Sequence, residues 1–322
     1  MITEKYFCFI LLLFVLGSCK KENDPGSGGT KPNFTLGKNR FTISIDGDER
    51  EYFVHVPKSY HGTVSVPVAF MLHGTSGDGE KFYNISGWKE LGEVENIITV
   101  FPSSWKYCIK DIDGIKTTTK WNVPPDAEWT YCAGQVPRDD IKFLKAIISE
   151  LDAKYTIDLH RIYLSGFSNG GQMAAKCAIE MGDVFAAIAE NAGSFYKDST
   201  YVPKRKLPII FQVGNIDYGP GNTGPAVALS KLETILSTAG KGIVYNDIAQ
   251  RHIKYFTLDP KYTMSGDTTN IRVANYKPAA GSGYEFRVLL VSGMDHIYPN
   301  GVNHPVYAAK LHWDWMKQYT KP

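Results

Sequence analysis

The sequence lacks an excess of charge of either sign, and its basic residues form no dense run. Its 322 residues include 35 Lys+Arg and 33 Asp+Glu, which gives a formal net charge of +2 at pH 7. This balance provides little attraction to phosphate backbones or to anionic membrane surfaces. We therefore expect no nucleic-acid partner. The length and the ordinary apolar content fit one large globular domain or two small ones.

A long apolar run is also missing, since residues 6–16 (YFCFILLLFVL) are too few to span a bilayer comfortably. Their length is typical of the hydrophobic region of a signal peptide. The following Leu16-Gly17-Ser18-Cys19 resembles a bacterial lipobox, in which cleavage leaves Cys19 as the lipidated N-terminus, and Lys20 after it implies outer-membrane sorting in a diderm bacterium. The alternative is a plain secretory peptide with an incidental cysteine.

The residues after this leader are polar and rich in Gly and Pro, so they cannot bury a core. We therefore predict a signal peptide over residues 1–19, a flexible tether over 20–35 and a folded domain over 36–322. This arrangement implies a lipoprotein at the outer membrane or cell surface.

Cysteine is scarce, and no Cys and His spacing resembles a metal site, so we expect no metal. Cys177 is expected to be a small buried residue. Cys108 and Cys132 flank one stretch of the chain and would lie in an oxidising compartment, which favours a disulfide between them over two free thiols. Such a bond would contribute roughly 3 kcal/mol in the chain-entropy model.

The central motif is Gly166-Phe167-Ser168-Asn169-Gly170, between the apolar run 161–164 and the helix-like residues 172–178. This pattern indicates a strand, a sharp turn and a helix. A G-x-S-x-G turn of this kind holds its serine in a strained backbone conformation, with small neighbours so that strand and helix can approach. Ser168 is therefore the predicted nucleophile.

An alcohol is a poor nucleophile at its own pKa, so Ser168 needs a base, and that base needs an orienting carboxylate. In α/β-hydrolases the order along the chain is Ser, acid, His. Asp217 follows a buried run and is the predicted acid, and His296 follows the last core run and is the predicted base. Asp295 is a weaker alternative acid, because a neighbour of His296 would have to fold back onto it.

Two N–H donors are also required for the oxyanion of a tetrahedral intermediate. We predict the backbone of Asn169 as one donor. Thr75, in the loop after residues 66–72, is preferred over Ser76 as the other. His73 is expected to be a structural partner in that loop.

Buried apolar runs alternate with helix-like stretches, which predicts an α/β fold with a mostly parallel central sheet and helices on both faces. Residues 41–46 and 51–56 are expected to form a hairpin around Asp46-Gly47-Asp48. A second, peripheral hairpin is expected from 252–258 and 270–276. The other predicted strands are 66–72, 97–101, 161–164, 184–191, 207–213 and 284–291, and the predicted helices are 87–94, 139–154, 172–178 and 304–319.

Residues 103–137 interrupt this alternation and form an aromatic-rich insertion. Long ordered loops of this kind often bind ligands. Trp105, Trp121 and Trp129 are therefore candidate substrate-binding residues for sugar rings or aromatic acyl groups. The alternative is that these rings pack the insertion onto the body of the domain.

Taken in order, LHGTSGDGEKF, the helix that starts at Asp139-Asp140, SGFSNGGQMA, the strand that ends at Asp217 and GMDHIYPNG resemble the secreted polyhydroxybutyrate depolymerase and feruloyl esterase group of α/β-hydrolases. The resemblance covers about residues 40–318. It implies a serine carboxylesterase that uses Ser168, Asp217 and His296 and needs no cofactor.

The chain departs from depolymerases of this group by having no threonine-rich linker and no separate polymer-binding domain, which disfavours attack on solid polyester. Feruloyl or acetyl esters of plant polysaccharide are therefore the leading expected substrates. A short-chain polyhydroxyalkanoate or aromatic polyester hydrolase, a peptidase on the same fold, and a noncatalytic glycan-binding lipoprotein are the alternatives.

Overall fold

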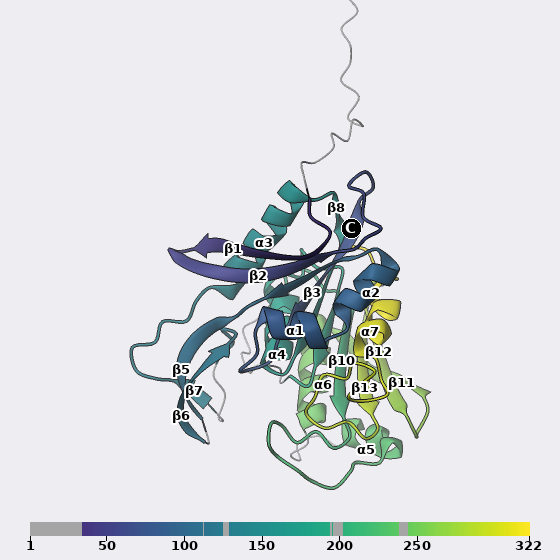
Figure 1. Ribbon diagram of the computed structural model, residues 1–322. Coiled ribbons are helices and arrows are strands. Elements are labelled where there is room, and N and C mark those ends of the chain that lie inside the picture. Colours follow the sequence, from purple (N-terminus) through teal and green to yellow (C-terminus); the bar gives the residue numbers. More distant parts are fainter. Residues whose placement is uncertain (1–33, 112, 125–128, 194, 196–201, 238–243) are drawn as a thin grey trace, which may run out of the picture. The chain divides into compact units, whose positions relative to one another are not determined.

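A large twisted sheet organises the chain in the computed structural model, which describes residues 34–111, 113–124, 129–193, 195, 202–237 and 244–322 (Figure 1). The predicted signal peptide, Cys19 and the tether as far as residue 33 lie outside the described residues. Over the described ranges the sheet has ten strands, in the order β1-β2-β4-β3-β8-β9-β10-β13-β12-β11. These strands are β1 (Gly37–Ile45), β2 (Asp48–Val56), β3 (Val66–Leu72), β4 (Ile98–Pro102), β8 (Ile157–Phe167), β9 (Ala187–Asn191), β10 (Ile209–Gly214), β11 (Leu258–Gly266), β12 (Ile271–Pro278) and β13 (Phe286–Val291).

The middle of the sheet, from β4 to β13, is parallel, and the strands at both sides of it pair antiparallel. Every residue of β3, β9 and β10 is buried, as expected for parallel strands covered on both faces. The predicted hairpin is confirmed at β1 and β2, where Asp46 (φ 55°) and Gly47 (φ 89°) take the two left-handed positions of a tight turn.

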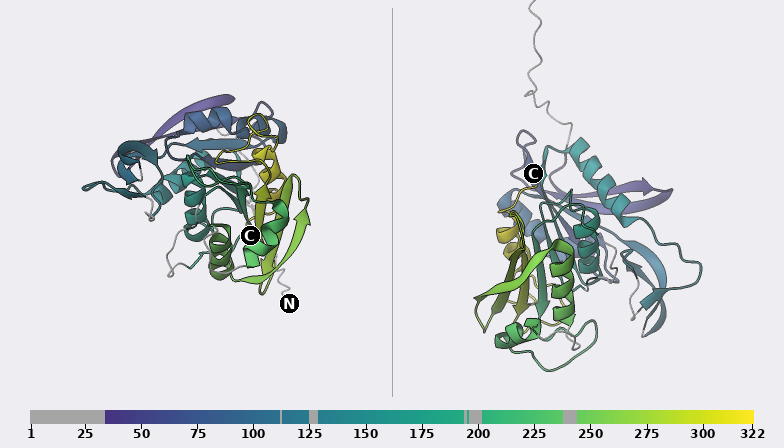
Figure 2. Two further views of the ribbon diagram at one scale, coloured as in Figure 1. Left: turned by 90° about the horizontal axis from the view of Figure 1, so that it is seen from below. Right: turned by 180° about the vertical axis from the view of Figure 1, so that it is seen from behind.

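Helices cover both faces of the sheet, as predicted (Figure 2). Each face has its own apolar cluster. Side chains of α3, α4, α5 and α6 belong to one cluster, and side chains of α1, α2 and α7 belong to the other. The helices are α1 (Gly79–Ile85), α2 (Trp88–Glu95), α3 (Asp140–Lys154), α4 (Asn169–Glu180), α5 (Leu232–Ser237), α6 (Val244–Phe256) and α7 (Ala308–Met316).

The insertion forms a small antiparallel sheet with the strand order β6-β5-β7. Its strands are β5 (Trp105–Asp111), β6 (Gly114–Lys120) and β7 (Trp129–Tyr131). A disulfide joins Cys108 in β5 to Cys132 directly after β7, with their Cα atoms 5.5 Å apart. Cys177 is a buried free thiol on α4.

The strand predicted over residues 252–258 is wrong, because these residues form the end of α6 and the start of β11. Ile248, His252 and Phe256 are four residues apart and buried together, so helical spacing prevails over the local alternation of apolar and polar residues. Thr257, with φ 52°, breaks the helix before β11. The peripheral hairpin is instead made by β11 and β12.

Candidate active site

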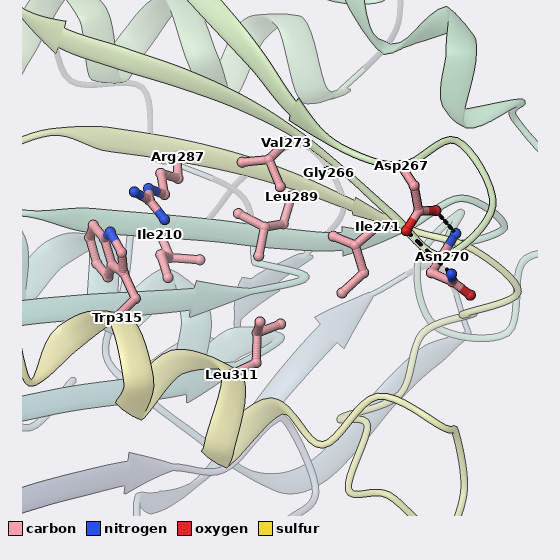
Figure 3. A pocket seen from close by; sticks show the side chains of 10 residues that line it. All are labelled: Ile210, Gly266, Asp267, Asn270, Ile271, Val273, Arg287, Leu289, Leu311 and Trp315. Carbon is pink, nitrogen blue, oxygen red and sulfur yellow. Dashed lines mark hydrogen bonds between the residues drawn. The ribbon is translucent and has the colours of Figure 1, made fainter.

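A cavity of about 280 Å³ lies between α7 and the strands β10, β12 and β13 (Figure 3). Its lining is mostly apolar and includes Ile210, Val273, Leu289, Leu311 and Trp315. None of the predicted catalytic side chains lines this cavity.

Ser168 lies in the turn between β8 and α4, with φ 53° and ψ −120°. A non-glycine residue in this region is strained, and such strain is held only where the surroundings fix the backbone. Here the Ser168 N–H donates to the carbonyl of Asn191 at the end of β9, at 2.8 Å. The sharp turn predicted from the G-x-S-x-G motif is confirmed.

The glycines of the motif are needed for close backbone approach. A Cβ atom on Gly166 would lie 2.1 Å from the carbonyl oxygen of Gly170, and one on Gly170 would lie 2.4 Å from the carbonyl oxygen of Leu72. Both distances are too short for real atoms, so larger residues would separate strand and helix and displace Ser168.

Ser168, His296 and Asp217 form a continuous hydrogen-bonded chain. The Oγ of Ser168 lies 2.9 Å from Nε2 of His296, and Nδ1 of His296 lies 2.9 Å from Oδ1 of Asp217. Because a carboxylate only accepts, Nδ1 of His296 donates to Asp217, which leaves Nε2 to accept the hydroxyl proton. The side chain of Asp217 is only 4% exposed, whereas Asp295, the alternative acid, is exposed.

The loops that hold Asp217 and His296 meet because β10 and β13 are neighbouring parallel strands. Asn215 joins the two loops: its N–H donates to the carbonyl of Val291, and its Oδ1 accepts from the N–H of Gly293, at 2.8 Å each. A Cβ atom on Gly214 would lie 1.8 Å from the carbonyl oxygen of Met294, so only glycine allows this approach.

The loop after β3 lies directly against Ser168, since a Cβ atom on Gly74 would be 3.1 Å from the Cβ of Ser168. The Ser76 N–H is already used, because it donates to the carbonyl of Thr119 at 3.0 Å. This favours Thr75, as predicted, over Ser76 as a donor. Asn169 is the first residue of α4, where N–H groups have no carbonyl one turn earlier in the helix.

His73 is a buried structural residue, in agreement with the sequence prediction. Its Nε2 accepts from the Ser104 N–H at 3.0 Å, and its Nδ1 donates to the carbonyl of Gly74 at 2.7 Å. Burial lowers the pKa of His73 to about 4, so the ring is neutral at pH 7.

The prediction that Trp121 contacts substrate needs correction, because its side chain is 0% exposed. The Trp105 ring lies against the guanidinium groups of Arg50 and Arg138, at 5.8 and 5.1 Å. Trp129 is 7% exposed. Its ring centroid lies 4.0 Å from Nζ of Lys120. Trp121 therefore packs the insertion onto the body of the domain, which was the alternative to substrate binding. The rings of Trp105 and Trp129 also contact protein groups.

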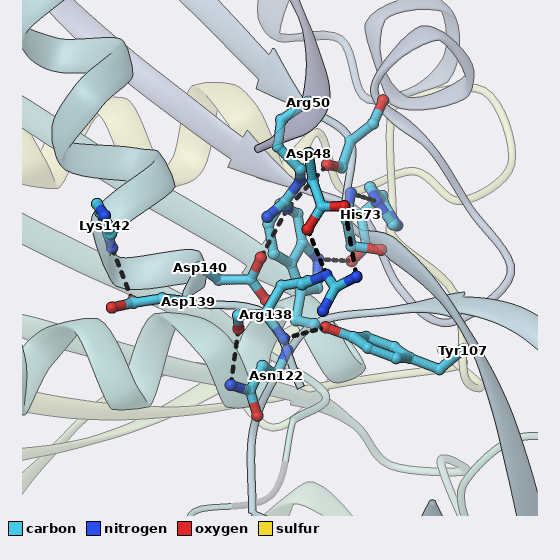
Figure 4. Close-up of polar contacts among 12 residues, drawn as sticks. Asp48, Arg50, His73, Tyr107, Asn122, Arg138, Asp139, Asp140 and Lys142 are labelled. Atoms are coloured by element: carbon cyan, nitrogen blue, oxygen red, sulfur yellow. Dashed lines mark hydrogen bonds and ion pairs between the residues drawn. The ribbon is translucent and has the colours of Figure 1, made fainter. Parts of the chain in front are cut away.

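A buried ion pair beside the insertion was missed from sequence (Figure 4). Arg50 Nη2 lies 2.7 Å from Oδ1 of Asp140, and both side chains are at most 1% exposed. Oδ2 of Asp140 accepts from the Asn122 N–H at 2.6 Å. Burial raises the pKa of Asp140, and Arg50 opposes that shift. The sequence signal for this ion pair was the second aspartate of Asp139-Asp140. A helix start needs only one capping aspartate, and Asp139 is that cap, so Asp140 is left for another role.

Within the described ranges, no group of three or more His, Cys, Asp or Glu side chains is placed to hold a metal ion. The same part of the chain contains no helix that is both long and apolar enough to cross a membrane.

Comparisons with known proteins find sequence similarity to one family model and to proteins named as esterases and a depolymerase. The model of the prolyl oligopeptidase family matches residues 128–217. A putative esterase NocK from Nocardia uniformis subsp. tsuyamanensis is 25% identical over 208 residues, 61% of this chain and 56% of the relative. Feruloyl esterase B from Piromyces equi is 25% identical over 85% of this chain and 46% of its own length. Poly(3-hydroxyalkanoate) depolymerase C from Paucimonas lemoignei is 28% identical over 47% of this chain and 33% of its own length. The chain thus spans about half or less of these relatives.

Solved structures of similar architecture cover most of the chain. An acetyl xylan esterase from Aspergillus awamori matches with a TM-score of 0.58 and 15% identity, over 87% of this chain and 99% of that one. An S-formylglutathione hydrolase from Agrobacterium tumefaciens matches with a TM-score of 0.54 and 13% identity, over 89% and 97%. Together with the parallel sheet, the helices on both faces and the serine at the strand-to-helix turn, these similarities identify the chain as a protein of the α/β-hydrolase fold.

Proposed function

We propose that the chain is a serine carboxylesterase that hydrolyses its substrate through an acyl-enzyme. The observation that supports this most strongly is the hydrogen-bonded chain from Ser168 through His296 to Asp217, with 2.9 Å at each step. The similarity to proteins named as esterases supports the same reaction class.

In the proposed reaction, the Oγ of Ser168 attacks the ester carbonyl carbon while Nε2 of His296 takes the hydroxyl proton. The resulting oxyanion accepts hydrogen bonds from the backbone N–H groups of Asn169 and Thr75. His296 then gives its proton to the leaving alcohol, and the acyl group stays on Ser168. A water molecule, deprotonated by His296, releases the acid and restores the hydroxyl. Asp217 holds the imidazole in the tautomer that both steps require.

We further propose feruloyl or acetyl esters of plant polysaccharide as the substrate class. Relatives named as feruloyl esterase B and acetylxylan esterase A support this choice. The relative named poly(3-hydroxyalkanoate) depolymerase C supports the alternative of a short-chain polyhydroxyalkanoate or aromatic polyester hydrolase. The prolyl oligopeptidase match supports a peptidase as a further alternative.

Substitution of Ser168 tests the mechanism. We expect Ser168→Ala to lower kcat for short p-nitrophenyl esters by about 10⁴-fold or more, because residual catalysis would come only from substrate binding and the oxyanion donors. Ser149→Ala, an exposed serine on α3, is the matched control and should retain activity. The wild type and the control should be labelled by a fluorophosphonate, whereas Ser168→Ala should not.

An unlabelled wild type would favour the noncatalytic glycan-binding protein, and full activity in Ser168→Ala would exclude the proposed nucleophile. Assays with methyl ferulate, acetylated xylan, soluble hydroxybutyrate oligomers and a peptide anilide distinguish the substrate classes. If kcat/KM is highest for methyl ferulate or acetylated xylan, the proposed substrate class is supported. If it is highest for the hydroxybutyrate oligomers or the peptide anilide, the corresponding alternative replaces it.

We also propose that the chain is a membrane-anchored lipoprotein, with a signal peptide over residues 1–19, lipidation at Cys19, a tether over 20–35 and the catalytic domain over 36–322. The sequence Leu16-Gly17-Ser18-Cys19 supports this part of the proposal.

A further inference from the structure

Trp121 connects the two segments that supply the proposed oxyanion donors. Its backbone N–H donates to Oδ1 of Asn169 at 2.7 Å, and its indole N–H donates to the carbonyl of His73 at 2.8 Å. Asn169 directly follows the nucleophile, and His73 lies two residues before Thr75. One residue of the insertion thus bonds to both sides of the site.

The strand before Trp121 holds the loop of Thr75 more directly. Ser76 is bonded twice to β6: its N–H donates to the carbonyl of Thr119, and its Oγ lies 2.6 Å from Oγ1 of Thr118. The Thr119 hydroxyl also donates to the carbonyl of Gly77. Nζ of Lys120 donates to Oγ1 of Thr75 at 3.3 Å.

The residue after Trp121 is anchored to the helices beneath. The Asn122 N–H donates to the buried Asp140 on α3, and Nδ2 of Asn122 donates to the carbonyl of Arg138 at 2.7 Å (Figure 4). Nζ of Lys176 on α4 donates to the carbonyl of Asn122 at 3.1 Å. This end of the segment is therefore fixed to the helices that support the sheet.

Trp121 and the His73 carbonyl are shielded from water, which strengthens the hydrogen bond between them. Trp121 and His73 are both 0% exposed, and their rings lie 5.1 Å apart. Water therefore does not compete for the indole hydrogen bond, and loss of this donor would leave the His73 carbonyl buried without it.

We propose that residues 118–122, which we name the brace, hold the two oxyanion donors at a fixed separation, and that Trp121 is the positioning residue that joins them. This inference rests on the proposed esterase function. It assigns a catalytic purpose to the aromatic insertion that does not require any of its rings to touch substrate.

The geometry of the reaction explains why such a brace matters. Oxyanion donors must lie 2.7–3.1 Å from an oxygen position that exists only in the transition state. A displacement of about 1 Å can lower the rate about 100-fold. Ground-state binding of the ester depends little on these donors, so a loosened brace should lower kcat and leave KM almost unchanged.

Trp121→Phe tests this inference because it keeps an aromatic ring and removes the indole donor. We expect kcat to fall roughly 10- to 100-fold with KM within about twofold. The affinity for a trifluoromethyl ketone, which forms a tetrahedral adduct with the serine, should fall by the same factor as kcat/KM. Trp313→Phe is the matched control, since it also removes an indole hydrogen bond of a buried tryptophan, to Glu95, but lies on α7. This control should retain the wild-type kcat.

A second pair of variants decides the matter if Trp121→Phe fails to fold, as judged by circular dichroism. Thr119→Val keeps the shape of the side chain and removes the hydroxyl that bonds Gly77, whereas Thr119→Ser keeps the hydroxyl. We expect Thr119→Val to lower kcat several-fold and Thr119→Ser to restore it.

A folded Trp121→Phe with wild-type kcat would overturn the inference, as would a rise in KM without a change in kcat. If Trp121→Phe does not fold, equal kcat in Thr119→Val and Thr119→Ser would overturn it. Failure of the proposed function looks different, because the wild type would then hydrolyse no ester in the substrate panel and would not react with a fluorophosphonate.

Discussion

Two aspartates near His296 allow the role of the carboxylate to be tested at the scale of single residues. Asp217 accepts from Nδ1 of His296 and also from the Gly219 N–H, at 2.9 Å each, so its position is fixed. Asn in its place can present an N–H to the imidazole and favour the wrong tautomer. We expect Asp217→Asn to lower kcat about 10⁴-fold, measured with saturating p-nitrophenyl acetate.

Asp295→Asn is the control for this substitution, because Asp295 is exposed and next to the same histidine. It should change kcat less than about twofold, since water and salt screen the exposed charge of Asp295 from His296. A comparable loss in both variants would contradict the assignment of Asp217 as the orienting acid.

Single residues also show what sequence reasoning can and cannot locate. Ser168, Asp217 and His296 each follow a buried apolar run, so the order of strand ends was enough to bring them together. Trp121 has no such signal. It follows β6, most of whose residues are not buried, and its hydrogen-bond partners His73 and Asn169 are distant in the sequence.

At the scale of elements, α7 packs a neutral histidine against the central sheet. Nε2 of His312 donates to Oε1 of Gln212 in β10 at 3.1 Å. Nδ1 of His312 is buried and has no partner among the residues described. A proton there would be desolvated and unpaired, so burial lowers the pKa of His312 to about 3.

This contact predicts a loss of stability in acid. Between pH 6.5 and about 3 the unfolded chain binds a proton at His312 and the folded chain does not, so the free energy of unfolding falls as the pH falls. We expect this residue to contribute a loss of about 2 kcal/mol between pH 7 and pH 5. Urea unfolding of His312→Gln at both pH values should show a smaller loss than the wild type. An equal loss in the two proteins would exclude this origin.

Elements were predictable where burial on both faces produced a continuous apolar run, as in β3, or one interrupted by a single polar or charged residue, as by Gln212 in β10 and Arg287 in β13. The prediction failed at α6, because the alternation in residues 252–258 is also typical of a strand. Only the structure shows that His252 packs four residues from Ile248 and Phe256, as in a helix. The small sheet of the insertion was not predicted, because cross-strand pairing and the bond between Cys108 and Cys132 hold much of it, and its strands have no long apolar runs.

For the folded part of the chain, parallel pairing places the carboxyl ends of β3, β8, β10 and β13 at one edge of the sheet. This is why Nε2 of His296 lies 2.9 Å from Oγ of Ser168, although the two residues are 128 positions apart in the sequence. The brace comes from the insertion, which lies outside the pattern of alternating strands and helices. Assembly of the proposed site therefore depends on the strand order of the large sheet and on the small sheet of the insertion.

Because the proposed site is assembled from described residues beyond position 72, the leader should affect location and not chemistry. We expect the full chain, expressed in a diderm bacterium, to incorporate labelled palmitate and to fractionate with membranes. Cys19→Ala should lose the label, because no other residue of the lipobox offers a thiol, while its ester hydrolysis per folded molecule stays unchanged. Cys8→Ala, which removes a cysteine within the apolar run, is the control that should keep the label. Wild-type protein that is cleaved, unlabelled and free of membranes would instead indicate a plain secretory peptide, since stable anchoring requires attached acyl chains when no membrane-spanning helix is retained.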